Sequence, residues 1–207
     1  MTVKTRYQLV PGGTQVSYHA ITTAATVVNL TTHPYFNLHG EGSSSTDRHR
    51  LVINAANYTP ARKDGVPTGE IRDVTDSALD FRTGPLLGEA RNAALAQGLA
   101  RKGGFDHNMV VDGQGWREHC RLTGEDGLTL VLQSDQPALQ VYGGSHFDGT
   151  QIGTSGQFYG PNAGVALETQ NFPDAPNHPN FPSSALRPGQ VYNTTTRWLL
   201  KPPATWG

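Results

Sequence analysis

A short apolar run that leads directly into a proline-rich loop sets the strongest limit on how this chain can fold. Residues 165–170 are mostly apolar, carry one carboxylate, and are followed by four prolines between Pro173 and Pro182. Proline fixes its own φ angle and cannot donate a backbone hydrogen bond. The sequence therefore predicts a strand that ends in a rigid loop.

The carboxylate of this strand belongs to Glu168. Alternation along a strand places Ala166, Glu168 and Gln170 on one face, and Val165, Leu167 and Thr169 on the other. A glutamate with a fixed direction and small or polar neighbours is placed as a general base needs to be. A surface ion pair with an arginine is the commoner role of an isolated glutamate, so the strand alone does not decide between the two.

Length, charge and composition exclude several classes of function. The 207 residues fit one sizeable domain, which we expect to span residues 1–207. The net charge of −1 provides no basic field for nucleic acid or an anionic membrane, and no apolar run is long enough to cross a bilayer. Residues 1–8 lack the order of a signal peptide. We therefore expect a cytoplasmic protein with a small, uncharged ligand.

Cysteine and histidine spacing gives no sign of a bound metal or cofactor. Cys120 is the only cysteine, so the sequence excludes an internal disulfide and a thiolate cluster. None of the eight histidines lies at the i, i+4 spacing of helical metal sites. The sequence also contains no GxGxxG or P-loop motif, so we expect no metal and no cofactor.

Short β-branched runs between glycine and proline turns predict an all-β fold. Only residues 86–100 suggest a helix, and Gly88 and Gly98 weaken that pattern. Including the strand described first, the predicted strands are 3–10, 15–21, 24–30, 50–54, 116–122, 128–134, 138–142, 165–170 and 190–200.

A histidine follows the third of these runs. The order of His33, Pro34, Tyr35 and Phe36 predicts that a strand ends at His33, where proline fixes the backbone and two aromatic rings can pack around the imidazole. Such a histidine can line a pocket wall. It can equally be an ordinary half-buried histidine whose ring nitrogens are satisfied locally.

A second polar cluster follows paired glycines. Asp106, His107 and Asn108 follow Gly103, Gly104 and one phenylalanine, at the start of an apolar run. They offer converging polar groups for a ligand, but an aspartate in this place can also cap a turn.

Aromatic residues gather in the last third of the chain. Tyr142, Phe147, Phe158 and Tyr159 lie near polar residues, and aromatic rings suit a sugar-binding cleft because pyranose rings present apolar C–H faces. The same residues would also suit the core of a β-sandwich.

Four segments together resemble the aldose 1-epimerase family, also called galactose mutarotases. They are residues 29–38, 104–108, 140–142 and 166–182, of which the last is the longest and most specific. The resemblance implies a large antiparallel β-sandwich with a concave sugar cleft, and a reaction that interconverts the α and β anomers of an aldohexose. It further implies that Glu168 is the general base, that His33 is the general acid, and that Asp106 and Gln140 hold sugar hydroxyls.

The resemblance covers only the C-terminal part of the family pattern, roughly three-fifths of it on the usual scale of such domains. It therefore implies that the family's N-terminal strands are lacking here, together with an active-site arginine and a second histidine that they supply. We expect a missing N-terminal segment or a partner chain.

Three other functions remain open on the sequence. The chain could be a non-catalytic carbohydrate-binding module or an inactive mutarotase fragment. It could also be a glycoside hydrolase with Asp106 and Glu168 as its carboxylate pair. An epimerase of phosphorylated sugars is the third, although the sequence shows no clear cluster of cationic residues for a phosphate.

Overall fold

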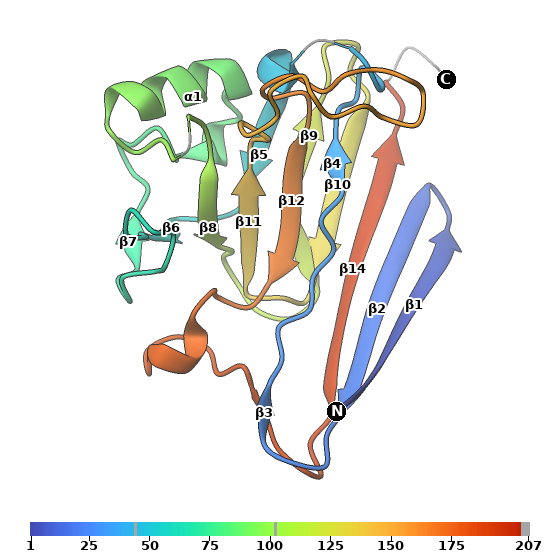
Figure 1. The fold of residues 1–207 in the computed structure, drawn as a ribbon, viewed down its shortest axis with the longest axis vertical. Coiled ribbons are helices and arrows are strands. Elements are labelled where there is room, and N and C mark those ends of the chain that lie inside the picture. Colours follow the sequence, from blue (N-terminus) through green and yellow to red (C-terminus); the bar gives the residue numbers. More distant parts are fainter. Residues whose placement is uncertain (44, 102, 204–207) are drawn as a thin grey trace.

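Two antiparallel sheets of six strands each form the body of the protein (Figure 1). The structure is a computed structural model and describes residues 1–43, 45–101 and 103–203. The strands are β1 (Thr2–Val10), β2 (Gly13–Ile21), β3 (Thr26–Val27), β4 (Tyr35–Phe36), β5 (Arg50–Ile53), β6 (Asn57–Thr59), β7 (Arg72–Asp73), β8 (Asp106–Val110), β9 (Arg117–Thr123), β10 (Thr129–Ser134), β11 (Ala138–Tyr142), β12 (Val165–Gln170), β13 (Ala185–Leu186) and β14 (Tyr192–Lys201).

The first sheet has the strand order β1-β2-β14-β10-β9-β5, and the second has the order β4-β12-β11-β8-β6-β7. β3 and β13 form a separate two-stranded pair. Every strand pairing among the described residues is antiparallel, which confirms the predicted all-β sandwich.

Apolar side chains fill the space between the two sheets. Leu51, Leu122 and Leu132 of the first sheet and Leu139 and Leu167 of the second are almost completely buried in one cluster. Each sheet contributes alternate residues of its strands to this core, so the remaining residues of β8, β11 and β12 face outward. The outer face of the second sheet is where the candidate site lies.

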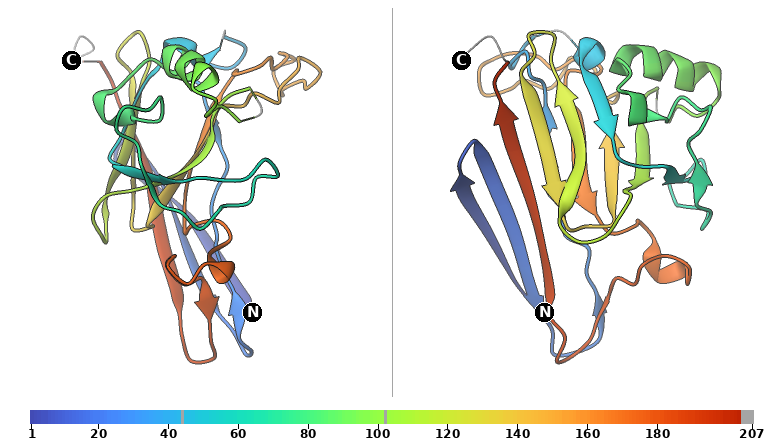
Figure 2. Two further views of the ribbon diagram at one scale, coloured as in Figure 1. Left: turned by 90° about the vertical axis from the view of Figure 1, so that its left-hand side faces the viewer. Right: turned by 180° about the vertical axis from the view of Figure 1, so that it is seen from behind.

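One α-helix, α1 (Leu87–Ala96), covers one end of the sandwich (Figure 2). Leu87, Ala90 and Ala94 pack into the core between the sheets. The helix ends earlier than the predicted residue 100, because Gly98 adopts a φ of 68° and turns the chain out of the helix. No helix in the described ranges is both long and apolar enough to cross a membrane.

The β1–β2 hairpin extends the first sheet past β14, beyond the edge of the second sheet (Figure 1). All of β1 up to Leu9 is exposed, and the side chains of Tyr7 and Leu9 are 64% and 86% exposed. β1 therefore has no second layer among the described residues, whereas Val16, Tyr18 and Ala20 of β2 are buried.

The strand predicted at residues 24–30 is too long. Only β3 forms there, because its pairing with β13 is limited to two residue pairs. His33 therefore lies not at the end of a strand, as predicted, but in an extended segment between β3 and β4.

Candidate active site

The strand register places polar residues of three neighbouring strands in one row. Glu168 of β12 is opposite Gln140 of β11, and Gln140 is opposite Asn108 of β8. Directly opposite residues of a sheet point to the same face. Leu167 lies in the core, and Thr169 bonds Thr196 of the other sheet, so Glu168 must point outward. The predicted division of β12 into two faces is confirmed.

Glu168 meets His33 on this outer face. The Nε2 atom of His33 lies 3.2 Å from Oε1 of Glu168, although the two residues are far apart in the chain. The side chain of Glu168 is only 10% exposed, whereas that of His33 is 45% exposed. Burial raises the pKa of Glu168, the charge of His33 opposes that rise, and Asp106 adds to it. The structure thus brings the two predicted catalytic residues together.

The segment that carries His33 is attached to β12 at both of its ends. Asn29 and Asn171 exchange two hydrogen bonds, of 3.0 and 2.9 Å, through the Asn29 side chain and the Asn171 backbone. At the other end the side chain of Asn37 donates to the carbonyl of Ala163 over 3.0 Å. Two asparagines therefore hold the segment against the strand of Glu168, which explains how a residue outside any strand is positioned.

Aromatic rings surround the imidazole of His33. The ring of Tyr35 has its centroid 4.9 Å away, and Tyr142 presents its edge at 6.2 Å. Tyr142 also bonds the Nδ1 atom of His146, and the ring of Phe147 meets that of Tyr35 edge-on, with the two centroids 5.0 Å apart. Of the rings expected in a sugar cleft, Tyr142 therefore lies next to His33, and Phe147 lies one ring farther away, against Tyr35.

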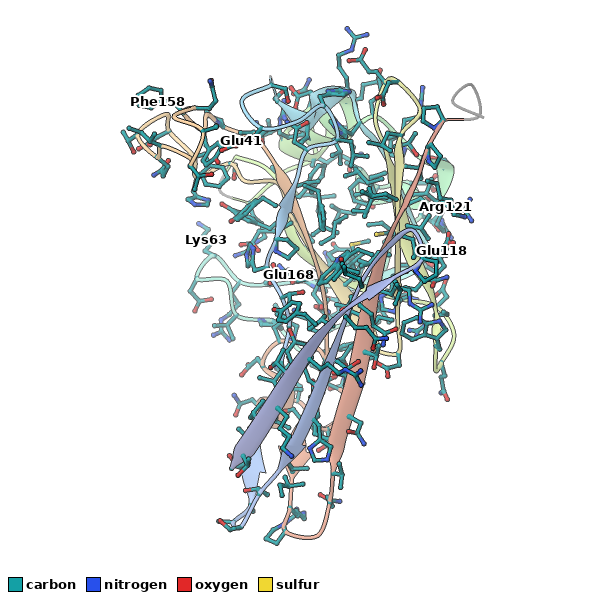
Figure 3. The ribbon with its side chains drawn as sticks, turned by 90° about the vertical axis from the view of Figure 1, so that its right-hand side faces the viewer. Glu41, Lys63, Glu118, Arg121, Phe158 and Glu168 are labelled. Atoms are coloured by element: carbon teal, nitrogen blue, oxygen red, sulfur yellow. The ribbon has the colours of Figure 1, made fainter. Side chains whose placement is uncertain are left out.

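The other two aromatic residues lie farther out. Phe158 is 61% exposed, and the hydroxyl of Tyr159 donates to Glu41. In Figure 3, Glu41 and Phe158 lie on the side of the molecule away from Glu118 and Arg121 of the first sheet. None of the four predicted aromatic residues belongs to the core between the sheets.

Asp106 and Gln140 form the next part of the site. The Nε2 atom of Gln140 donates to Oδ1 of Asp106 over 2.8 Å. The Oε1 atom of Gln140 and the Oδ1 atom of Asn108 are buried and have no hydrogen-bond partner among the described residues. Buried acceptors are rarely left unpaired, because each costs free energy that a ligand donor would recover. The hydroxyl groups of a sugar are donors of this kind.

Asn108 is a further candidate site residue, which was not included among the four predicted ones. It lies two residues after Asp106 on β8, so the alternation of the strand puts both on the outer face. His107 lies between them, points to the opposite face and bonds the carbonyl of Leu99 over 2.9 Å. The suggestion that Asp106, His107 and Asn108 all converge on one ligand is therefore wrong for His107.

A groove with a volume of about 810 Å³ lies behind His33. It separates the His33 segment from the exposed end of the first sheet, and Tyr7, Phe36, Leu130, Trp198 and Leu200 are among its apolar lining residues. Glu168, Asp106 and Gln140 do not line it. His33 therefore has the candidate site on one side and an uncovered apolar groove on the other.

Comparison with known proteins finds relatives of this chain. The family model described as aldose 1-epimerase matches residues 1–198. A galactose mutarotase of Homo sapiens is 38% identical over 192 residues, which are 92% of this chain and 54% of that protein. An aldose 1-epimerase of Escherichia coli (strain K12) is 33% identical over 190 residues, or 88% of this chain and 53% of that protein. The chain thus spans about half the length of these curated relatives.

Solved structures agree with the fold. The GalM/aldose epimerase homologue from C. elegans superposes with a TM-score of 0.86 at 26% identity, over 97% of this chain and 60% of that one. The galactose 1-epimerase from Lactobacillus acidophilus NCFM gives a TM-score of 0.82, also at 26% identity, over 97% and 57%.

Proposed function

Because the chain belongs to the aldose 1-epimerase family, we propose that it interconverts the α and β anomers of an aldohexose such as galactose or glucose. The observation that supports this most directly is the contact between His33 and Glu168, beside unpaired hydrogen-bond acceptors on an outward-facing sheet. The matched relatives are named as enzymes, which favours catalysis over a role in sugar binding alone.

Opening of a pyranose ring needs a base at one oxygen and an acid at another, both bonded to C1. A carboxylate and an imidazolium that serve these two oxygens must therefore stand side by side, as Glu168 and His33 do at 3.2 Å. Burial raises the pKa of Glu168, and the charge of His33 opposes that rise, so His33 favours the ionised carboxylate that a base needs.

In the proposed reaction, Glu168 takes the proton of the C1 hydroxyl while His33 protonates the ring oxygen. The bond between C1 and the ring oxygen breaks and an aldehyde forms. Rotation about the bond between C1 and C2 presents the other face of the carbonyl. On closure, the hydroxyl made from the ring oxygen gives its proton back to His33 as its oxygen attacks C1. The bond between C1 and the ring oxygen re-forms, and Glu168 returns its proton to the carbonyl oxygen, which becomes the C1 hydroxyl.

The remaining site residues would hold the sugar during this step. Asp106 and Gln140 would bind hydroxyl groups, and the buried Oδ1 atom of Asn108 would accept from another. The rings of Tyr35 and Tyr142 would contact the apolar C–H face of the pyranose.

We further propose that additional polypeptide covers the groove behind His33, either as a missing N-terminal segment or as a partner chain. Two observations support this: the apolar lining of the groove, and the greater length of the relatives. Uncovered apolar surface of this kind commonly marks an interface.

Polarimetry of freshly dissolved α-galactose and α-glucose with the purified chain tests the proposed activity. We expect the chain to accelerate the change in optical rotation, and His33→Gln to abolish most of that acceleration because glutamine cannot donate a proton as an acid. His19→Gln is the matched control, since His19 is exposed on β2 in the other sheet. A folded chain that binds galactose without accelerating mutarotation would contradict the proposal and indicate a binding module.

A further inference from the structure

A second cleft lies at the edge of the second sheet, apart from the groove behind His33. It has a volume of about 390 Å³, and four basic residues line it: Arg62, Lys63, Arg72 and Arg101. We propose that this cleft binds an oxyanion, namely a phosphate group that is either free or carried by a sugar.

Two loops distant in sequence form the walls of the cleft, and Arg101 joins them. Residues 60–63 follow β6, and residues 98–101 precede β8. The Nη1 atom of Arg101 donates to the carbonyls of Ala61 and Arg62, over 3.2 and 2.8 Å. The guanidinium is thereby held in place, while its other N–H groups make no hydrogen bond with a described residue. A fixed guanidinium with free donors suits the oxygens of a phosphate.

The charges of the cleft are only partly balanced. Arg62 forms an ion pair with Asp64 at 3.2 Å, and Arg72 forms a bidentate ion pair with Glu70 in which both contacts are 2.7 Å. Lys63 and Arg101 have no carboxylate partner among the described residues. The cleft therefore keeps two positive charges, although the whole chain has a net charge of −1.

The buried His107 adds no positive charge to the cleft. His107 lines the cleft, and its pKa is lowered to about 4, mainly by burial and additionally by the charge of Arg101. The carbonyl of Leu99 accepts a hydrogen bond from the His107 ring, so the neutral ring leaves the positive charge to the arginines and the lysine.

The cleft adjoins the proposed sugar site. Asp106 directly precedes His107 on β8, so the outer face of this strand carries the sugar-binding residue while its inner face lines the cleft. Lys63 projects on the side of the molecule away from Glu118 and Arg121 (Figure 3). The cluster of cationic residues that the sequence did not reveal is thus assembled by the fold. The cleft is proposed as a binding site in its own right and does not depend on the mutarotase reaction.

Isothermal titration of the chain with inorganic phosphate at low ionic strength tests this inference. We expect saturable binding that Lys63→Gln and Arg101→Gln each weaken about tenfold or more, because each removes one charge-assisted contact. Arg121→Gln, which alters an ion pair on the other sheet, should bind as the unaltered chain does. Lys63 makes no hydrogen bond or ion pair with a described residue, so its variant tests the site without disturbing the fold.

A parallel titration with a hexose 6-phosphate distinguishes the two sources of the phosphate. Tighter binding than that of inorganic phosphate would mean that the sugar part contributes, and equal affinity would mean that the free ion is the ligand. The inference would be overturned if the chain bound neither inorganic phosphate nor the hexose 6-phosphate. It would also be overturned if the Lys63→Gln chain and the unaltered chain bound phosphate with equal affinity. Neither result would depend on whether the chain accelerates mutarotation.

Discussion

Replacement of Glu168 by glutamine is the change that most directly tests the proposed chemistry. In the unaltered chain, Nε2 of His33 lies 3.2 Å from the carboxylate of Glu168. Glutamine has nearly the same shape and can keep this contact, but it cannot act as a base. Loss of a positioned base typically costs ~10²–10⁴ in rate. At about 1.36 kcal/mol per tenfold, that loss corresponds to ~2.7–5.4 kcal/mol in the activation barrier.

The same change should not destabilise the fold. Burial raises the pKa of Glu168 above its ordinary value, so the folded state binds the proton more tightly than the unfolded state does. The resulting stabilisation is fully present below the ordinary pKa and is lost as the pH rises through the raised pKa. At neutral pH the buried carboxylate therefore opposes folding, and glutamine removes this cost. We expect the variant to be at least as stable at neutral pH.

The assay is the initial rate of mutarotation of α-galactose by polarimetry, with thermal unfolding of each variant measured in parallel. Glu118→Gln is the matched control, because Glu118 pairs with Arg121 on the opposite side of the molecule (Figure 3). A Glu168→Gln chain that turns over galactose at a nearly normal rate would refute the role of Glu168. Loss of activity together with a large loss of stability would refute the argument that the carboxylate serves chemistry and not folding.

Three further predictions concern binding, acid stability and the core. Gln140→Ala removes both the hydrogen bond to Asp106 and a buried acceptor, so steady-state kinetics should show KM for galactose raised about tenfold, with a smaller change in kcat. Three buried histidines should make the fold sensitive to acid: burial lowers the pKa values of His49, His107 and His119 to about 4, 4 and 3. The stability that they contribute as neutral rings is complete above their ordinary pKa. It is lost as the pH falls toward the lowered values. Urea titrations at successively lower pH should therefore give falling midpoints, and His119→Leu should show a weaker fall. Leu132→Ala should lower the free energy of unfolding by about 2–5 kcal/mol, because the side chain is completely buried between the sheets, whereas Leu95→Ala on the exposed side of α1 should change it by less than about 0.5 kcal/mol.

The longest strands could be predicted from the sequence, and the shortest could not. Local patterns identified β1, β10, β11 and β12 because each has enough alternating or β-branched residues to show a period of two. β4, β6, β7 and β13 are two or three residues long, which is too short for any period, and they exist because a neighbouring strand supplies their hydrogen bonds. For the same reason the run at 24–30 was predicted too long.

The four predicted site residues came from two sources, and only one of them was local. The outward direction of Glu168 followed from alternation along β12, and the same rule would have separated Asn108 from His107 if a strand had been predicted at 106–110. The pairing of Glu168 with His33 came only from the resemblance to a family, since the two residues are far apart in the chain and no periodic pattern relates them.

By itself, the sequence determined the longer strands, the face of β12 that carries Glu168 and the residue types available for acid and base chemistry. These depend on backbone geometry and on neighbours within a few residues. Only the tertiary structure decided that Asn29 and Asn171 hold the His33 segment against β12, and that Arg101 joins two loops into a basic cleft. Both arrangements require side chains to bond backbone groups of remote segments, and that proximity is fixed by strand register and core packing rather than by local preference.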